Sequence, residues 1–139
     1  MRRVIISTLI CLLATTSFAA ESVDTEVKET VTTKSGLKYT SFIEGTGPAP
    51  RPTDTVRVNY RGTLPNGREF DSSYKNGGPV YFQLGNVIKC WTEGLQLMKV
   101  GGKAKLLCPS NLAYGDEGIV GVVPRYATLI FEVELLEIK

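Results

Sequence analysis

The side chains that most often perform catalysis are scarce in this 139-residue chain. It contains no histidine, which excludes histidine general bases, histidine-based triads and histidine-ligated metals. Its three cysteines lack C-x-x-C spacing, which argues against a zinc site. The only tryptophan, Trp91, lies within the run 87–95. Any site built around Trp91 would bind a ligand through an apolar aromatic surface.

The region of Trp91 is predicted to be a short helix. Ile88, Trp91, Leu95 and Met98 form one apolar stripe at helical spacing. The pair Gly101-Gly102 is expected to end the helix. Judged from this helix alone, Trp91 is better explained as an ordinary core aromatic than as a binding residue.

Composition limits the partners of the chain. A formal net charge of +2 gives no electrostatic argument for a nucleic-acid partner or an anionic membrane. The length suits one domain with one modest core.

Residues 1–19 are predicted to be a secretory signal peptide. Arg2 and Arg3 precede an apolar run, 4–13, which is too short to span a bilayer. Ser17-Phe18-Ala19 fits a cleavage site, so the mature chain is expected in the periplasm and off the membrane. An uncleaved anchor is the less favoured alternative.

Two further segments follow the signal. Residues 20–33 are polar and acidic, which predicts a disordered linker. Residues 34–139 are predicted to be the folded domain. We find no dimerisation segment and expect a monomer.

Alternating apolar positions predict that the domain is mostly β-strand. Val56, Val58 and Tyr60 share one strand face. The segment 64–67 ends in Asn-Gly, which predicts a tight type I′ hairpin turn. A later alternation, 103–108, places two lysines toward water and Cys108 inward.

The end of the chain completes this pattern. A long irregular loop, 109–125, is apolar enough to argue for a function rather than disorder. The final strand has an apolar face at Ala127, Leu129, Phe131, Val133 and Leu135. The fold class is therefore α+β, with an antiparallel sheet and one short helix on one face.

Four sequence runs resemble the FK506-binding-protein family of peptidyl-prolyl cis–trans isomerases. They are 67–73, 87–94, 113–115 and 124–136. They occur in family order and at nearly family spacing across 34–139. The resemblance implies a five- or six-stranded antiparallel sheet wrapped around the helix.

The resemblance also implies a proline-binding pocket without cofactor or metal. Its counterparts here are Tyr60, Phe70, Asp71, Val87, Ile88, Trp91, Tyr114 and Phe131. Trp91 is the expected floor, and the Ile88 N–H and Tyr114 hydroxyl are expected to hydrogen-bond ligand carbonyls. Further substrate-binding positions are Val80, Ile119, Val122 and Val123.

The chain departs from the family pattern in four places, one of which is a segment between Gly85 and Val87 that is two residues shorter than in small cytosolic relatives. Val80 replaces a usually aromatic residue and is expected to narrow one wall. Asn76 replaces an arginine that often pairs with the Asp71 counterpart. Ile119 lies at a position that is often polar. These changes are expected to tune substrate preference and drug affinity rather than abolish the pocket. Because of Val80, we expect FK506- or rapamycin-like macrolides to bind more weakly than to the best family members.

An apolar aromatic cup suits prolyl isomerisation. The peptide bond has a rotation barrier of about 18–20 kcal/mol, and X-Pro isomerisation can limit folding. Twisting the amide removes resonance, so an apolar pocket that fits the twisted form lowers the barrier without proton transfer. Asp71 is therefore not expected to act as a general base. The alternative function is a chaperone-like peptide binder with little turnover.

A disulfide between Cys90 and Cys108 is the last expectation. Signal cleavage removes Cys11 and leaves two cysteines in an oxidising compartment. Cys108 faces inward, and Cys90 borders the apolar stripe of the helix. The bridge would stabilise the domain by about 3 kcal/mol in the chain-entropy model. Two buried free thiols are the alternative.

Overall fold

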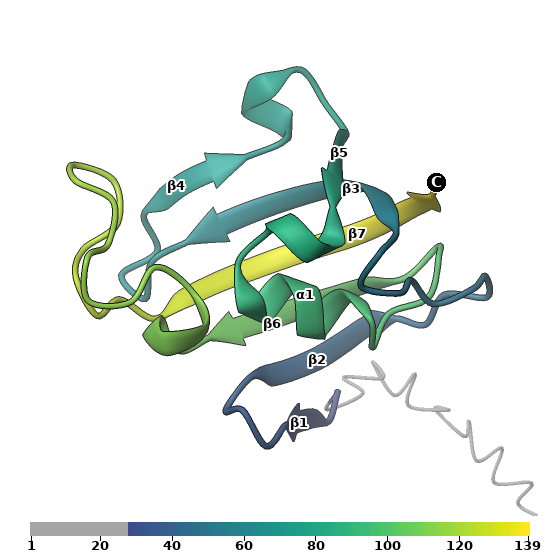
Figure 1. Cartoon of the computed structure of the whole chain (residues 1–139), viewed down its shortest axis with the longest axis horizontal. Coiled ribbons are helices and arrows are strands. Elements are labelled where there is room, and N and C mark those ends of the chain that lie inside the picture. Colours follow the sequence, from purple (N-terminus) through teal and green to yellow (C-terminus); the bar gives the residue numbers. More distant parts are fainter. Residues whose placement is uncertain (1–27) are drawn as a thin grey trace, which may run out of the picture.

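The computed structural model describes residues 28–139 (Figure 1). The predicted signal peptide, 1–19, and residues 20–27 of the predicted linker lie outside the described residues. The strands are β1 (Thr30–Thr32), β2 (Lys38–Ile43), β3 (Thr55–Thr63), β4 (Glu69–Ser72), β5 (Val80–Gln83), β6 (Lys103–Cys108) and β7 (Leu129–Ile138). The α-helix is α1 (Lys89–Leu95), and three 3₁₀ turns are η1 (Tyr74–Asn76), η2 (Leu84–Asn86) and η3 (Ser110–Leu112).

All seven strands pair antiparallel in one sheet. Their order is β1-β2-β6-β7-β3-β4, and β5 also pairs with β3. The α1 helix lies across one face of this sheet (Figure 1). The predicted α+β class is confirmed. The sheet has more strands than the five or six that were predicted. This is because β3 pairs with both β4 and β5 along one side, and β1 adds a further edge strand.

Strand β1 corrects the predicted boundary of the folded domain. Thr30–Thr32 was expected to belong to the disordered linker, but it pairs with Lys38–Thr40 of β2. The Thr30 and Thr40 hydroxyls also lie 2.7 Å apart. These residues are exposed and bury no core of their own. These residues are held in an ordered strand by backbone hydrogen bonds to β2, a contact that the composition of the segment does not reveal.

The core fills the space between α1 and the sheet. Alternate residues of β3, β6 and β7 are buried there, as the sequence alternation predicts. The α1 helix ends at Leu95, earlier than the predicted stop at Gly101-Gly102. Beyond Leu95, hydrogen bonds from Leu97 to Gly94 and from Met98 to Leu95 form tighter turns. Met98 is 2 % exposed, so the buried apolar stripe continues beyond the end of α1.

The β3–β4 hairpin turn differs from the predicted type I′ geometry. The Gly67 N–H donates to the Leu64 carbonyl, and Gly67 alone of the turn residues has positive φ, at 87°. A type I′ turn needs positive φ at both central residues. Proline at position 65 holds φ near −65° and prevents this. The result is a type I-like turn followed by a left-handed glycine.

In the part of the chain from residue 28 onward, no helix is long and apolar enough to span a membrane.

Candidate functional site: an aromatic pocket above Trp91

An apolar pocket of about 320 Å³ opens between α1 and one end of the sheet. Its lining is mainly aromatic and aliphatic, with one carboxylate and one amide. The lining residues are Tyr60, Phe70, Asp71, Phe82, Asn86, Val87, Ile88, Trp91, Tyr114 and Phe131. All eight residues that the sequence predicted for the proline cup are therefore brought together.

Trp91 lies at the base of this pocket and is 4 % exposed. Its indole meets three rings edge to face: Tyr60 at 5.0 Å, Phe131 at 5.3 Å and Phe82 at 5.4 Å between centroids. Phe70 packs edge to face on Phe131 at 5.6 Å. Edge-to-face packing is a favoured arrangement of aromatic rings. The floor and walls are thus one interlocked aromatic cluster.

A hydrogen bond between two strands fixes the polar wall. The Tyr60 hydroxyl donates to Asp71 Oδ2 at 2.7 Å. Burial, and then this bond to the carboxylate, raise the pKa of Tyr60 well above that of a free phenol. Asn76, which takes the place of the expected arginine, donates to Asp71 Oδ1 at 3.4 Å and to the Ser72 carbonyl at 3.0 Å. Asp71 therefore works as an acceptor that orients Tyr60.

The remaining polar groups come from η2, α1 and the loop after β6. Ile88 is the N-cap residue of α1, and its N–H makes no hydrogen bond to any other described residue. Tyr114 reaches the pocket from the loop and is 37 % exposed. Burial, followed by the nearby Asp71 charge, raises the pKa of Tyr114. Both donors therefore remain available to a ligand.

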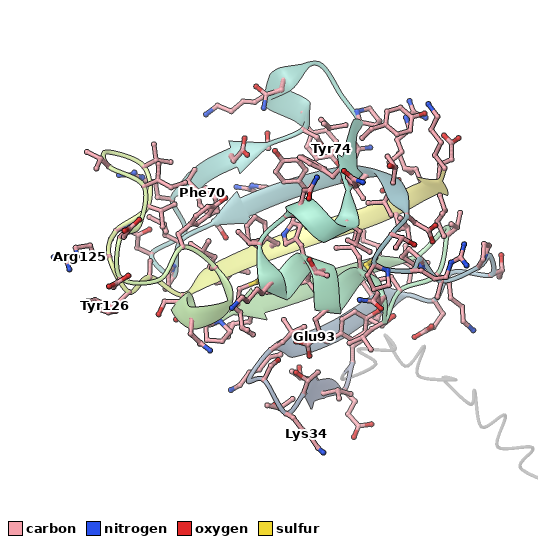
Figure 2. The ribbon with its side chains drawn as sticks, in the orientation of Figure 1. Lys34, Phe70, Tyr74, Glu93, Arg125 and Tyr126 are labelled. Carbon is pink, nitrogen blue, oxygen red and sulfur yellow. A yellow bond between two sulfur atoms is a disulfide. The ribbon has the colours of Figure 1, made fainter. Side chains whose placement is uncertain are left out.

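Four of the predicted substrate-binding residues lie outside this pocket. Val80 pairs with Val58 in the sheet and does not line it. Ile119, Val122 and Val123 line a separate hollow of about 400 Å³ at the loop tip. That part of the loop extends beyond the sheet at the end where β4 begins, and Arg125 and Tyr126 point outward there (Figures 1 and 2).

Phe82 and Asn86 line the pocket but were missed in the sequence. Phe82 has the same inward direction as Val80, two residues away. Its ring reaches Tyr60 at 5.8 Å as well as Trp91. The wall thought to be narrowed by Val80 is therefore supplied with an aromatic ring by Phe82. This removes the reason for expecting weak macrolide binding.

The opposite face of the sheet carries a larger hollow, of about 600 Å³, with different chemistry. It is lined by Asn59, Arg61, Glu69, Ser72, Tyr74, Lys75, Lys103, Glu132 and Glu134. Arg61 pairs with Glu69 at 2.7 Å there. Opposite charges on neighbouring strands make this a solvated face. Within residues 28–139, no three His, Cys, Asp or Glu side chains gather into a possible metal site.

The predicted disulfide between Cys90 and Cys108 is present. It joins α1 to the last residue of β6, with the two Cα atoms 5.8 Å apart. Both cysteines are fully buried. Cys90 directly precedes Trp91, so the bridge lies beside the pocket floor.

Known proteins resemble the chain over this same region. The family model described as FKBP-type peptidyl-prolyl cis-trans isomerase matches residues 47–136. FkpA of Escherichia coli K12, named as an isomerase of this type, is 52% identical over 108 residues, covering 78% of this chain and 40% of FkpA. The chain thus spans less than half the length of that curated relative.

Solved structures agree with the sequence matches. The crystal structure of FkpA from Escherichia coli superposes with a TM-score of 0.77 at 50% identity, covering 79% of this chain and 51% of that one. A peptidyl-prolyl cis-trans isomerase from Pseudomonas syringae pv. tomato DC3000 gives 0.75 at 38% identity, covering 79% and 80%. The chain therefore belongs to the FKBP-type peptidyl-prolyl cis-trans isomerase family.

Proposed function

We propose that this protein accelerates cis–trans isomerisation of X-Pro bonds in exported polypeptides. The observation that carries the proposal is the aromatic pocket above Trp91, enclosed by Tyr60, Phe82 and Phe131. A proline ring is compact and apolar, and it fits a concave site of this size and lining.

The pocket would act by favouring the twisted amide over either planar isomer. Twisting breaks the resonance of the peptide bond and makes the carbonyl more ketone-like, so its oxygen carries less negative charge. An apolar cup disfavours the more polar planar amide, and contacts that fit only the twisted form raise the rate. No proton moves in this scheme, so a site without histidine is sufficient.

Two donors at the pocket would hold the substrate backbone. The Ile88 N–H is free to bind a carbonyl, and Tyr114, from the loop after β6, lines the same pocket. Tyr60 is already committed to Asp71. Its role would be to hold the wall in shape, with Asp71 orienting its ring rather than acting as a base.

Export to the periplasm is supported by two independent features. The first 19 residues have the charge, apolar run and small-residue end of a cleaved signal. The Cys90–Cys108 disulfide fits an oxidising compartment. We propose a monomer that acts on proline-containing clients during folding and is inhibited by FK506- or rapamycin-like macrolides.

The test is an isomerisation assay on an X-Pro peptide, with and without a macrolide. We expect acceleration over the uncatalysed rate and its loss when the macrolide occupies the pocket. Titration with the macrolide should change the fluorescence of Trp91, the only tryptophan. An uncatalysed rate with the folded, oxidised protein would reject the proposal.

The peptide-binder alternative rested on the narrowed wall at Val80 and on the missing arginine at Asn76, and the structure weakens both arguments. Phe82 restores the aromatic wall, and Asn76 still contacts Asp71. A competition assay separates the two functions: an isomerase should bind proline peptides more tightly than unfolded chains that lack proline. Equal competition would favour the peptide binder.

A further inference from the structure

Trp91, the base of the pocket, is held in place without a hydrogen bond of its own. Its Nε1 is buried and has no partner among the described residues. The orientation of the indole therefore depends on packing against Tyr60, Phe82 and Phe131. These rings lie on β3, β5 and β7, whereas Trp91 lies on α1. The geometry of the pocket thus depends on how firmly α1 is attached to the sheet.

The α1 helix has little stability of its own. It contains seven residues, and its N-cap residue, Ile88, provides no side-chain capping bond. Helices this short do not persist in water without tertiary contacts. An external attachment must therefore hold the first turn, which contains Trp91.

Two attachments act on the middle and second half of the helix. The Thr92 hydroxyl donates to the Leu84 carbonyl of η2 at 2.7 Å. Gly94 lies so close to β6 that an added Cβ would come within 2.8 Å of the Leu106 side chain. Neither contact directly restrains the backbone that leads from Ile88 into Trp91.

The disulfide supplies that missing restraint. Cys90 lies in the first turn of α1, and Cys108 ends β6, which pairs with β2 on one side and β7 on the other. Pro109 then begins the loop that carries Tyr114. The bridge therefore joins the start of the loop that carries Tyr114 to Cys90, which directly precedes Trp91 at the pocket floor. Both sulfurs are shielded from solvent.

We infer that the Cys90–Cys108 disulfide is a positioning element of the pocket, which holds Trp91 and the root of the Tyr114 loop in the geometry that binds proline. The inference rests on the proposed function only where its test measures isomerase activity. Reduction by a dithiol converts the bridge to two thiols while the dithiol becomes a disulfide. Reduction keeps both sulfurs in the core, whereas alanine at both positions also removes them and leaves a cavity. A control that loses a buried side chain elsewhere is therefore needed to separate lost packing from lost positioning of α1.

The test compares the oxidised protein with the double variant Cys90→Ala/Cys108→Ala at temperatures where circular dichroism shows both to be folded. We expect Trp91 to have lower fluorescence anisotropy and greater access to acrylamide in the double variant. Affinity for a prolyl peptide and kcat/KM should each fall by about three- to tenfold, because small misplacements of binding groups are costly.

The matched control is Leu135→Ala, which removes a fully buried β7 side chain that lines none of the pocket. It should destabilise the fold and leave the Trp91 readouts and peptide affinity of the folded protein unchanged. Wild-type values for Trp91 mobility and peptide affinity in the double variant would overturn the inference. So would equal changes in Leu135→Ala.

Two further outcomes are distinguishable. If the double variant does not fold, wild-type protein refolded with a dithiol takes its place, and failure of that protein to fold would also overturn the inference. If the oxidised protein lacks isomerase activity, the proposed function fails. The anisotropy and quenching of Trp91 still decide whether the bridge positions it.

Discussion

The pocket has two halves that are built in different ways. The sheet half carries Tyr60 and Phe131 on strands and is closed by Trp91, all less than 7 % exposed. The loop half carries Tyr114, followed by a tip where Val120 is 98 % exposed. Side chains that also belong to the core couple binding to stability, whereas loop side chains can change with little effect on the fold. Substitutions should separate the two halves on that basis.

The sheet half should show the largest loss on Trp91→Ala. This change removes the pocket floor and leaves a cavity beneath Tyr60, Phe82 and Phe131. Unfolding free energy should fall by about 3–5 kcal/mol, and kcat/KM should fall at least about tenfold. Denaturant melts followed by circular dichroism, with an isomerisation assay on the folded fraction, measure both. Full activity in a folded Trp91→Ala protein would contradict the role of the floor.

Tyr60→Phe should affect both stability and activity, to a smaller extent. It removes the 2.7 Å bond to Asp71 and leaves that carboxylate with only the longer contact from Asn76. We expect a loss of about 1 kcal/mol in unfolding free energy and a severalfold fall in kcat/KM as the wall loosens. Denaturant melts and peptide kinetics on the same preparation test this. Unchanged stability would show that the bond does not couple the strands.

Tyr114→Phe is the matched change in the loop half. The Tyr114 hydroxyl makes no hydrogen bond to another described residue, so the fold should lose less than about 0.5 kcal/mol. If it binds a substrate carbonyl, kcat/KM should still fall about two- to tenfold, the rate equivalent of one neutral hydrogen bond. A loss of stability as large as that of Tyr60→Phe would erase the distinction between the halves.

Arg68→Ala should have a smaller effect, confined to the loop. Arg68 Nη2 donates to the Val122 carbonyl at 3.1 Å and links the β3–β4 turn to the loop tip. Both groups are exposed, so the fold should change by less than about 0.5 kcal/mol. Amide hydrogen exchange at 119–123 should become faster, while exchange in β3 and β7 stays the same. Equal acceleration in the strands would mean that the link supports the whole domain.

The same division explains which parts of the site could be predicted from sequence. Alternation fixes the direction of strand side chains, so Tyr60 and Cys108 could be assigned to the inner face. It does not choose between Val80 and Phe82, because both point inward and only the pairing of β5 with β3 decides which reaches Trp91. The loop has no period at all, so the departure of Ile119 and Val122 from the pocket could not be foreseen.

The smallest expected effect is that of pH on kcat/KM. The pH profile tests whether proton transfer is absent from the reaction in both halves of the pocket. Burial and Asp71 raise the pKa values of Tyr60 and Tyr114, so both phenols keep their protons at neutral pH. The kcat/KM should therefore be flat between about pH 6 and 9. Because the folded state holds the Tyr60 proton more tightly than the unfolded state, its contribution to stability is fully present below about pH 10 and is lost as pH rises further. A bell-shaped profile near neutrality would mean that an ionisable group takes part in the reaction and would refute the twisted-amide scheme proposed for this pocket.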